Sequence, residues 1–199
     1  MKIYDISQDV FNCRVYPGDP SPEKKVLCSM ENGDKYNLTA FGMCAHNGTH
    51  IDAPRHFIKD GKAVDQIRLD ALIGAAYVAE GSGVISGDDA NEIIKRAKEK
   101  DPDAAKRILI KGEAIVSLEA AKTFAKAGIL LLGNEAQTVG PAESPMAVHL
   151  ALLGADVVLL EGIVLDGVFE GVYFLNAAPL NLSGADGAPC RAILIDAEK

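Results

Sequence analysis

The first third of the chain consists of short apolar runs separated by turn residues. The apolar runs are MKIYDI (1–6), KVLCSM (25–30) and YNLTAFGMC (36–44), and the segments between them, YPGDPSPE and ENGD, are rich in proline, glycine and aspartate. Short apolar runs with such boundaries are typical of β-strands that are joined by turns and loops. We therefore expect this part of the chain to form mostly strands and loops.

Helical patterns begin further along the chain. GDDANEIIKRAKEK (87–100) has acidic residues in its first turn and basic residues in its last, which suits the helix dipole, and Pro102 follows it. SLEAAKTFAKAG (117–128) begins with an N-capping serine and ends with glycine. SPMAVHLALLG (144–154) has the same two signals, with proline at the first helical position. Three helices are expected.

Buried strands alternate with these helices. RILIK (107–111), GILLLG (128–133) and DVVLLEG (156–162) are short, strongly apolar runs that precede or follow the helical segments. This alternation predicts an α/β fold with parallel pairing in the second half of the chain. No repeat, low-complexity tract or linker is evident, so residues 1–199 are expected to form one domain.

Charge and hydropathy exclude two classes of partner. The formal net charge is −8, whereas nucleic-acid and anionic-membrane surfaces need basic patches. The most apolar region (150–165) is interrupted by Gly154, Asp156 and Glu161 and is not expected to span a bilayer. We expect a small-molecule partner, with neither nucleic acid nor membrane.

The cysteines and the first residues favour a cytoplasmic protein. The four cysteines form no CxxC pair and no zinc-ribbon spacing: Cys13, Cys28, Cys44 and Cys190. MKIYDISQDV carries Asp5 and Asp9 where a signal peptide needs an unbroken apolar core. Reduced thiols and a cytoplasmic location are therefore expected.

HNGTHIDAPRH (46–56) concentrates the candidate chemistry. It contains three of the four histidines of the chain and one aspartate: His46, His50, Asp52 and His56. An extended segment would separate His46 from His56 by roughly 33 Å, at about 3.3 Å per residue. Asn47-Gly48 supplies a turn, however, and Pro54 bends the chain. A segment bent in this way can bring its side chains around one centre.

Imidazole nitrogens and a carboxylate oxygen suit zinc, manganese or iron. The alternative is that each histidine is an ordinary, hydrogen-bonded residue. His149 and Glu161 add a second element, because a mid-helix histidine and the last residue of a buried strand are costly positions for unpaired polar groups. The turn at Gly154 can bring the two together. A buried His–Glu hydrogen bond without a metal would explain the same pair.

The pattern H46-x-G48-T49-H50-x-D52-x-P54-x-H56-F57 resembles the signature of the cyclase-type metal-dependent hydrolases, which include bacterial kynurenine formamidases and isatin hydrolases. YPGDP (16–20), LLGADVVLLEGI (152–163) and LSGADGAPCRAIL (182–194) resemble further segments of that family in the same order. The resemblance implies a swivelling β/β/α fold with a mixed sheet and flanking helices, assembled as a homodimer or larger oligomer with sites near the subunit interface.

The resemblance also implies the roles of the site residues. His46, His50 and Asp52 are the expected primary metal ligands. Where two metals bind, Asp52 is expected to bridge to a second ion held with His56, His149 and Glu161; where one binds, His56 is expected to shuttle a proton. The expected metal is Zn²⁺, as one or two ions, with Mn²⁺ as the main alternative.

Hydrolysis of a C–N amide bond is the chemistry that such a centre suits. A bound metal lowers the pKa of water from about 15.7 toward 7 and polarises a carbonyl. His56 is the expected proton donor to the leaving nitrogen, and Glu161 is expected to bind metal or act as a base. The substrate is expected to be an aryl formamide such as N-formylkynurenine, or a cyclic amide, imide or small ester.

Two other functions are possible on the same residues. One is a non-catalytic metal- or small-molecule-binding protein on this fold. The other is a hydrolase that uses Cys44, which we interpret instead as a packed strand thiol. Three departures from the family pattern are expected on the pocket walls: Tyr16 in place of tryptophan, the segment IKGEAIVS (110–117), and Gly133-Asn134-Glu135.

Overall fold

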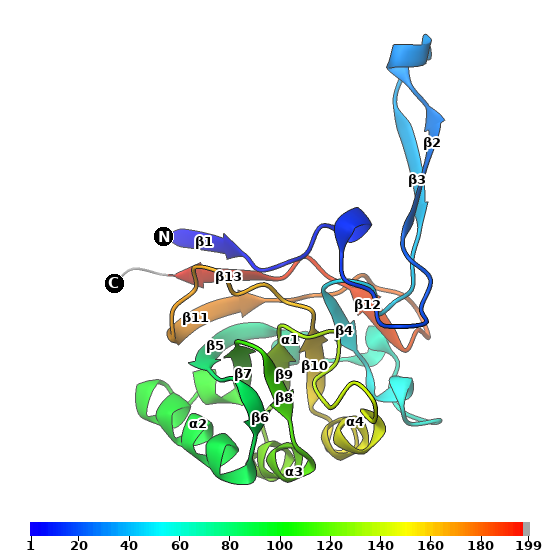
Figure 1. Ribbon diagram of the computed structural model, residues 1–199. Coiled ribbons are helices and arrows are strands. Elements are labelled where there is room, and N and C mark those ends of the chain that lie inside the picture. Colours follow the sequence, from blue (N-terminus) through cyan, green and yellow to red (C-terminus); the bar gives the residue numbers. More distant parts are fainter. Residues whose placement is uncertain (197–199) are drawn as a thin grey trace.

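The computed structural model describes residues 1–196 and centres on a nine-stranded mixed sheet (Figure 1). The strand order is β1-β13-β11-β5-β7-β9-β10-β4-β12. The bounds are β1 (Lys2–Asp5), β4 (His50–Asp52), β5 (Ile73–Glu80), β7 (Arg107–Lys111), β9 (Leu131–Asn134), β10 (Val158–Glu161), β11 (Gly171–Asn176), β12 (Gly187–Pro189) and β13 (Ile193–Asp196). Strands β5, β7, β9 and β10 pair in parallel, and the outer strands pair antiparallel. The expected parallel pairing in the second half is confirmed.

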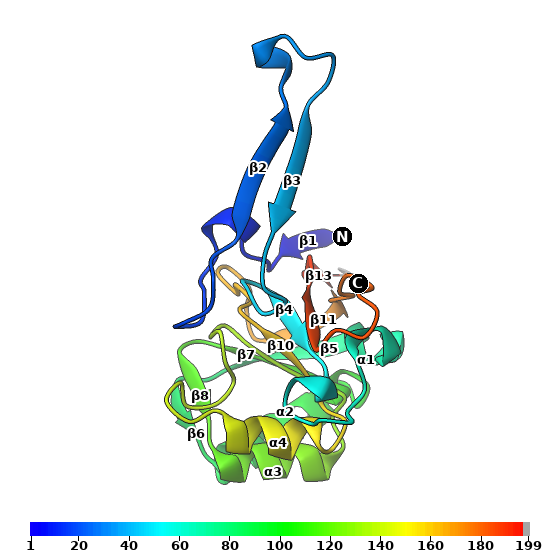
Figure 2. The ribbon, with the colours of Figure 1, turned by 90° about the vertical axis from the view of Figure 1, so that its right-hand side faces the viewer.

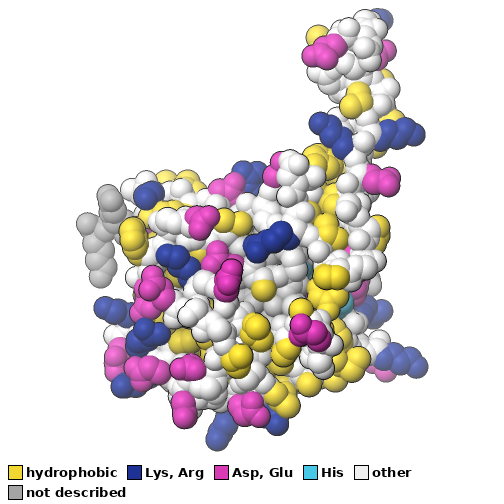
Figure 3. Space-filling view, viewed as in Figure 1, with side chains coloured by type: hydrophobic (Ala, Val, Ile, Leu, Met, Phe, Trp, Pro, Cys, Tyr) yellow, Lys and Arg dark blue, Asp and Glu magenta, His cyan; other side chains and the backbone are white. Residues whose placement is uncertain are grey.

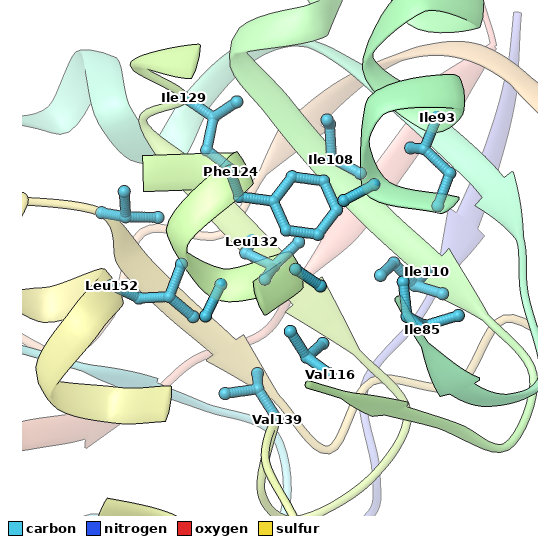
Figure 4. Close-up of a cluster of buried hydrophobic side chains, with 14 of the residues drawn as sticks. Ile85, Ile93, Ile108, Ile110, Val116, Phe124, Ile129, Leu132, Val139 and Leu152 are labelled. Carbon is cyan, nitrogen blue, oxygen red and sulfur yellow. The ribbon is translucent and has the colours of Figure 1, made fainter. Parts of the chain in front are cut away.

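The longer helices cover one face of this sheet (Figures 1 and 2). The helices are α1 (Leu69–Leu72), α2 (Gly87–Lys100), α3 (Leu118–Ala127) and α4 (Met146–Leu153), and the short strands β6 (Gly83–Ile85) and β8 (Ala114–Val116) form a separate parallel pair. Figure 4 shows Phe124 of α3 among Ile93, Ile108 and Leu132, between the helices and the sheet. The expected α/β fold with a mixed sheet and flanking helices is confirmed.

A second hydrophobic cluster lies on the other face of the central strands. Leu109, Leu131 and Leu160 pack there with Ile6 and Leu194 from the two ends of the described chain. The central strands are therefore buried on both faces, which explains why their sequences are almost continuously apolar.

Three of the expected elements have the predicted bounds or capping residues. Helix α2 covers residues 87–100 and strand β7 covers 107–111, as predicted. In α3, the Ser117 side chain accepts a hydrogen bond from the Ala120 amide, and Gly128 ends the helix at φ +71°. A left-handed residue at this position favours glycine because it has no Cβ.

The predicted cap of α4 is wrong. The helix begins at Met146, after Pro145, and no side-chain cap bond is recorded for its start within the described residues. The backbone of Ser144 instead closes a turn onto Pro141, with its amide 3.0 Å from that carbonyl. Gly154 has a right-handed φ of −66° and does not form the left-handed cap. Local turn geometry before the helix therefore overrides the serine signal.

A two-stranded hairpin projects from the body of the molecule (Figures 1 and 2). Strands β2 (Glu23–Cys28) and β3 (Leu38–Gly42) pair antiparallel, and we call this hairpin the arm. Its apolar side chains are largely exposed, with 58% for Val26 and 56% for Phe41. The remainder of the molecule is compact by comparison, and the arm makes its contacts with that body near its base, where Phe41 packs edge-on against Phe11.

No helix within residues 1–196 combines the length and apolar character that crossing a membrane requires.

Candidate metal centre

The backbone of residues 46–56 bends at the two predicted positions. Gly48 has φ +65°, and a Cβ there would lie 2.8 Å from the Cβ of Cys13, so both the conformation and the space favour glycine. Residues 50–52 then form β4, a three-residue strand that the sequence patterns did not predict. Pro54 begins a single turn of 3₁₀ helix that carries His56. These bends bring the three histidines and the aspartate of the segment to one place.

Strand β4 lies between β10 and β12 at one end of the large sheet. Its His50 is opposite Glu161 in the register with β10, so the two side chains face the same side. Nε2 of His50 is 3.5 Å from Oε2 of Glu161. Glu161 therefore lies beside the histidine segment, as predicted, and its role as a metal ligand stays a prediction.

Two groups of donor atoms share Asp52. Oδ1 of Asp52 is 2.7 Å from Nδ1 of His46 and 3.3 Å from Nε2 of His50. Oδ2 of the same carboxylate is 3.5 Å from Nε2 of His149, which is itself 3.2 Å from Oε1 of Glu161. In each group of three residues, one donor atom from each residue lies within 4.8 Å of the others. Each oxygen of Asp52 therefore faces a different group.

These donors suit a cation better than they suit one another. Asp52, His50, His149 and Glu161 are at most 2% exposed, and Oδ2 of Asp52 is buried without a hydrogen-bond partner in residues 1–196. Such an orphaned carboxylate oxygen is costly unless it is paired or coordinates a metal. Two imidazoles with a carboxylate, and one imidazole with two carboxylates, are sets that fit Zn²⁺ or Mn²⁺. The residues fit one or two divalent ions.

The protonation of the buried histidines supports the same conclusion. Burial alone would lower the pKa of His50, but its hydrogen bonds with Asp52 and Glu161 raise that pKa to about 10. The pKa of His149 is likewise raised to about 10, because Asp52 and Glu161 outweigh the effect of burial. The reverse holds for Asp52, whose pKa is well below its usual range because three histidines outweigh its burial. The carboxylates thus draw positive charge into the centre.

His56 lies at the edge of both groups. Its Nε2 is 4.0 Å from Oδ2 of Asp52, and its ring stacks on that of His46 at 3.9 Å between centroids. Burial lowers the pKa of His56, so the imidazole is neutral near pH 7. His56 is absent from the group formed by Asp52, His149 and Glu161. This position suits proton transfer better than ligation of a second ion, and both roles remain predictions.

Asp186 belongs to the centre and was not among the predicted site residues. Its Oδ2 lies 2.7 Å from Nε2 of His46 and 3.4 Å from Nδ1 of His56. The available signal was the Gly-Ala-Asp-Gly segment, which indicated the family but no role for Asp186 itself. Its distance of 140 residues from His46 concealed the contact, which depends on the pairing of β12 with β4.

A cavity of about 460 Å³ opens onto the donor groups. Its remaining walls include Tyr16, Cys44, Phe57, Gln137, Thr138 and Pro145. Thr138 lines the cavity, and its Oγ1 is buried and has no hydrogen-bond partner within residues 1–196. No lysine or arginine from residues 1–196 lines the cavity. Figure 3 shows histidine atoms at the surface near the base of the arm.

The expectation about pocket walls is correct for Tyr16 and wrong for the other two segments. Asn134 is fully buried, and the carboxylate of Glu135 accepts hydrogen bonds from the amides of Gly112 and Leu165. Glu135 therefore links the loops that contain Gly112 and Leu165, and both Glu135 and residues 110–117 lie outside the cavity lining. Cys44 lines the cavity but lies between β3 and β4, so its interpretation as a strand thiol is also wrong.

Comparisons with known proteins agree with this geometry. The model of the Cyclase family matches residues 4–141. A kynurenine formamidase of Erythrobacter litoralis is 34% identical over 207 residues, which cover 97% of this chain and 93% of that protein. A kynurenine formamidase of Bacillus anthracis is 35% identical over 208 residues and covers 97% of each chain.

Solved structures show the same fold. A potential metal-dependent hydrolase with cyclase activity superposes with a TM-score of 0.82 at 29% identity, covering 100% of this chain and 99% of its own. Isatin hydrolase A from Labrenzia aggregata superposes with a TM-score of 0.84 at 20% identity, covering 99% and 94%. With the family model and the sequence relatives, these findings show that the chain belongs to the cyclase family of metal-dependent hydrolases.

Proposed function

We propose that this chain hydrolyses the C–N bond of an amide, with an aryl formamide such as N-formylkynurenine as the first candidate and a cyclic amide such as isatin as the second. The observation that carries the proposal is the position of Asp52, whose two oxygens face two donor groups beside an open cavity. The names of the relatives support the choice of substrates.

The donor set supports Zn²⁺, as one or two ions, with Mn²⁺ as the alternative. His46, His50 and Asp52 would hold the first ion, and Asp52, His149 and Glu161 the second. Bound there, a divalent ion supplies Lewis-acid polarisation of the scissile carbonyl and activation of water near neutral pH. Glu161 accepts a hydrogen bond from the amide of Val139 and lies beside His149. Because these contacts hold its carboxylate in place, we assign Glu161 the role of a metal ligand in preference to that of a general base.

His56 would deliver the proton to the leaving nitrogen. It is neutral near pH 7, lies at the cavity, and has Nε2 turned toward Asp52. A neutral imidazole can accept a proton from water and donate it to the departing amine. Oγ1 of Thr138 is a further candidate for orienting the substrate, because it is buried at the cavity wall without a partner.

The walls favour a substrate with an aromatic ring. Phe57, Tyr16 and Pro145 offer apolar surfaces for a ring. Asp19 and Asp186 also line the cavity, without a lysine or arginine from residues 1–196 to offset them. An anionic substituent would therefore find no lysine or arginine partner from residues 1–196 in the cavity.

The arm supports assembly as a homodimer. Val26, Leu27, Met30 and Phe41 are between 49% and 60% exposed, and exposed apolar side chains gathered on one projecting element are typical of an interaction surface. A groove at the base of the arm is lined partly by the apolar residues Phe41, Met43 and Leu180 and partly by charged residues such as Arg191. A second copy of this chain can therefore cover the exposed apolar side chains of the arm. Analytical ultracentrifugation of wild type and Leu27→Glu would test this, since loss of the dimer is expected only in the variant.

A cytoplasmic location is part of the proposal and is supported by the four cysteines, all of which are unpaired thiols.

Elemental analysis and turnover assays together test the proposed function. We expect the purified protein to carry zinc or manganese and to hydrolyse N-formylkynurenine or isatin, and we expect a chelator to abolish turnover until metal is restored. Activity that survives complete removal of metal would refute the proposal. Bound metal with no turnover of any amide would instead favour the non-catalytic binding protein on the same fold, and loss of activity in Cys44→Ala would favour a thiol mechanism.

A further inference from the structure

We propose that Asp186 is a positioning residue that orients two imidazoles at once, the expected ligand His46 and the expected proton carrier His56. The inference rests on the proposed function for its kinetic consequence only. Its structural consequence, which concerns the imidazole protons and metal affinity, stands independently of any substrate.

The contacts place both rings between two carboxylates. Asp186 Oδ2 is 2.7 Å from Nε2 of His46 and 3.4 Å from Nδ1 of His56. On the opposite sides of the rings, Nδ1 of His46 is 2.7 Å from Asp52 Oδ1, and Nε2 of His56 is 4.0 Å from Asp52 Oδ2. The two rings stack at 29° to one another. One carboxylate oxygen thus contacts the outer nitrogen of both imidazoles.

This arrangement selects the proton-bearing nitrogen of neutral His56 and engages both nitrogens of His46. A carboxylate only accepts hydrogen bonds, so His56 donates from Nδ1 to Asp186, whereas each nitrogen of His46 has a carboxylate oxygen at 2.7 Å to which it can donate. Nε2 of His56 then carries a lone pair that faces Asp52 and is available to a proton. For His46, a metal would take the place of the proton on Nδ1, and Nε2 would remain the donor to Asp186. A carboxylate behind a metal-binding histidine is a common means of fixing the ring and raising its basicity.

The backbone holds Asp186 in place independently of its side chain. The carbonyl of Asp186 accepts a hydrogen bond from the amide of Ala53, and the next residue, Gly187, pairs with Asp52 in the register of β12 with β4. A Cβ on Gly187 would lie 2.7 Å from Cε1 of His46, so glycine leaves room for that ring. The Asp186 side chain is 47% exposed. Its removal should therefore leave the fold intact and alter the imidazoles.

The structure also provides a matched control. Asp65 is an exposed carboxylate that contacts the same loop, with Oδ1 accepting from the amide of Gly184 at 3.0 Å. It touches neither imidazole and does not line the cavity. Asp65→Asn therefore removes one negative charge beside the loop without affecting the proposed contacts.

Metal affinity provides the first test. Zinc affinity of the full-length protein would be measured by chelator competition for wild type, Asp186→Ala, Asp186→Asn and Asp65→Asn. We expect Asp186→Ala to weaken binding of the first ion by about 10- to 100-fold, as for other carboxylate partners of metal-binding histidines. Asp186→Asn should lose less, because its amide oxygen still accepts one hydrogen bond. Asp65→Asn should match wild type.

The imidazole protons provide the second test. In zinc-loaded protein labelled with ¹⁵N-histidine, we expect wild-type His56 to carry its proton on Nδ1, and Asp186→Ala to show a mixture of the two tautomers. Turnover, if a substrate is found, should fall in kcat more than KM rises. Unchanged zinc affinity, or an unchanged tautomer of His56, in Asp186→Ala would overturn the proposal. Absence of turnover in wild type would count against the proposed function only. The zinc affinity and the tautomer of His56 would still test the role of Asp186.

Discussion

The two halves of the candidate metal centre are built in different ways. The local half comes from one bent segment, with His46, His50 and Asp52 within seven consecutive residues. The distant half consists of His149 from α4 and Glu161 from β10, which are joined to Asp52 only by folding. Asp52 belongs to both, so it links a motif visible in the sequence to a pair that tertiary packing creates.

The halves also differ in their supporting contacts. In the distant half, the backbone carbonyl of Pro145 lies 2.9 Å from Nδ1 of His149, and the amide of Val139 donates to Glu161. In the local half, His46 has the Asp186 side chain as its outer partner, and His46 remains partly exposed at the cavity. The distant half is thus fixed by backbone groups in the core, whereas part of the local half depends on a half-exposed carboxylate.

Replacing the shared residue should have the largest effect. Asp52→Ala is expected to abolish binding at both metal positions and to lower kcat/KM by about 10³-fold or more, because the electrostatic contribution of the metal is worth several kcal/mol. Elemental analysis and steady-state kinetics would measure this. Retention of one tightly bound ion in Asp52→Ala would show that the halves are independent and that Asp52 does not bridge them.

Replacing one histidine in each half should separate the two positions. His50→Ala is expected to lower the content of the first ion, whereas His149→Ala should retain about one ion per chain and lose the second. Metal stoichiometry after gel filtration would show the difference. Equal losses in both variants would mean that the two positions fill only together, and a wild-type protein with one ion would place His149 outside the ligand set.

His56→Ala should affect turnover without emptying the centre. We expect kcat to fall by about 10²- to 10⁴-fold, the usual contribution of a general acid or base. The first ion should remain bound, because His56 lies 4.0 Å from the nearer oxygen of Asp52 and outside the first donor group. If turnover is unchanged, the assigned proton-transfer role is wrong.

The pH dependence of stability should differ between metal-free and loaded protein. Folding raises the pKa of His50 and of His149 to about 10 in the metal-free chain, so this contribution to stability is full below pH 6.5 and disappears as pH rises through 10. The depressed pKa of Asp52 adds no pH dependence above pH 6, because its contribution to stability is constant at every pH well above 3.8.

Metal replaces these protons, so the loaded protein should lack this decline. Thermal unfolding from pH 6 to 10 should therefore show a gap in Tm between loaded and metal-free protein that widens with pH. A metal-free Tm that stays parallel to the loaded one across this range would show that the two histidines are not charged by the carboxylates.

The accuracy of the sequence predictions depended on whether the deciding interactions were local. Helix α2 and strand β7 were predicted with the correct bounds, because dipole charges and apolar runs act within a few residues. The cap of α4 failed because the turn at Pro141 engages Ser144 before the helix begins. Strand β4 was not predicted, since three residues carry too little pattern and their pairing with β10 and β12 is entirely non-local.

By itself, the sequence determined the bent segment of residues 46–56, its three histidines and one aspartate, and the family that these residues indicate. Glycine and proline specify those bends through backbone sterics, which need no distant contact. Only the tertiary structure decided that the oxygens of Asp52 face separate groups, that His56 lies outside the second group, and that Asp186 joins the centre. These relations depend on strand register and helix packing across more than one hundred residues, and residue spacing alone carries no record of either.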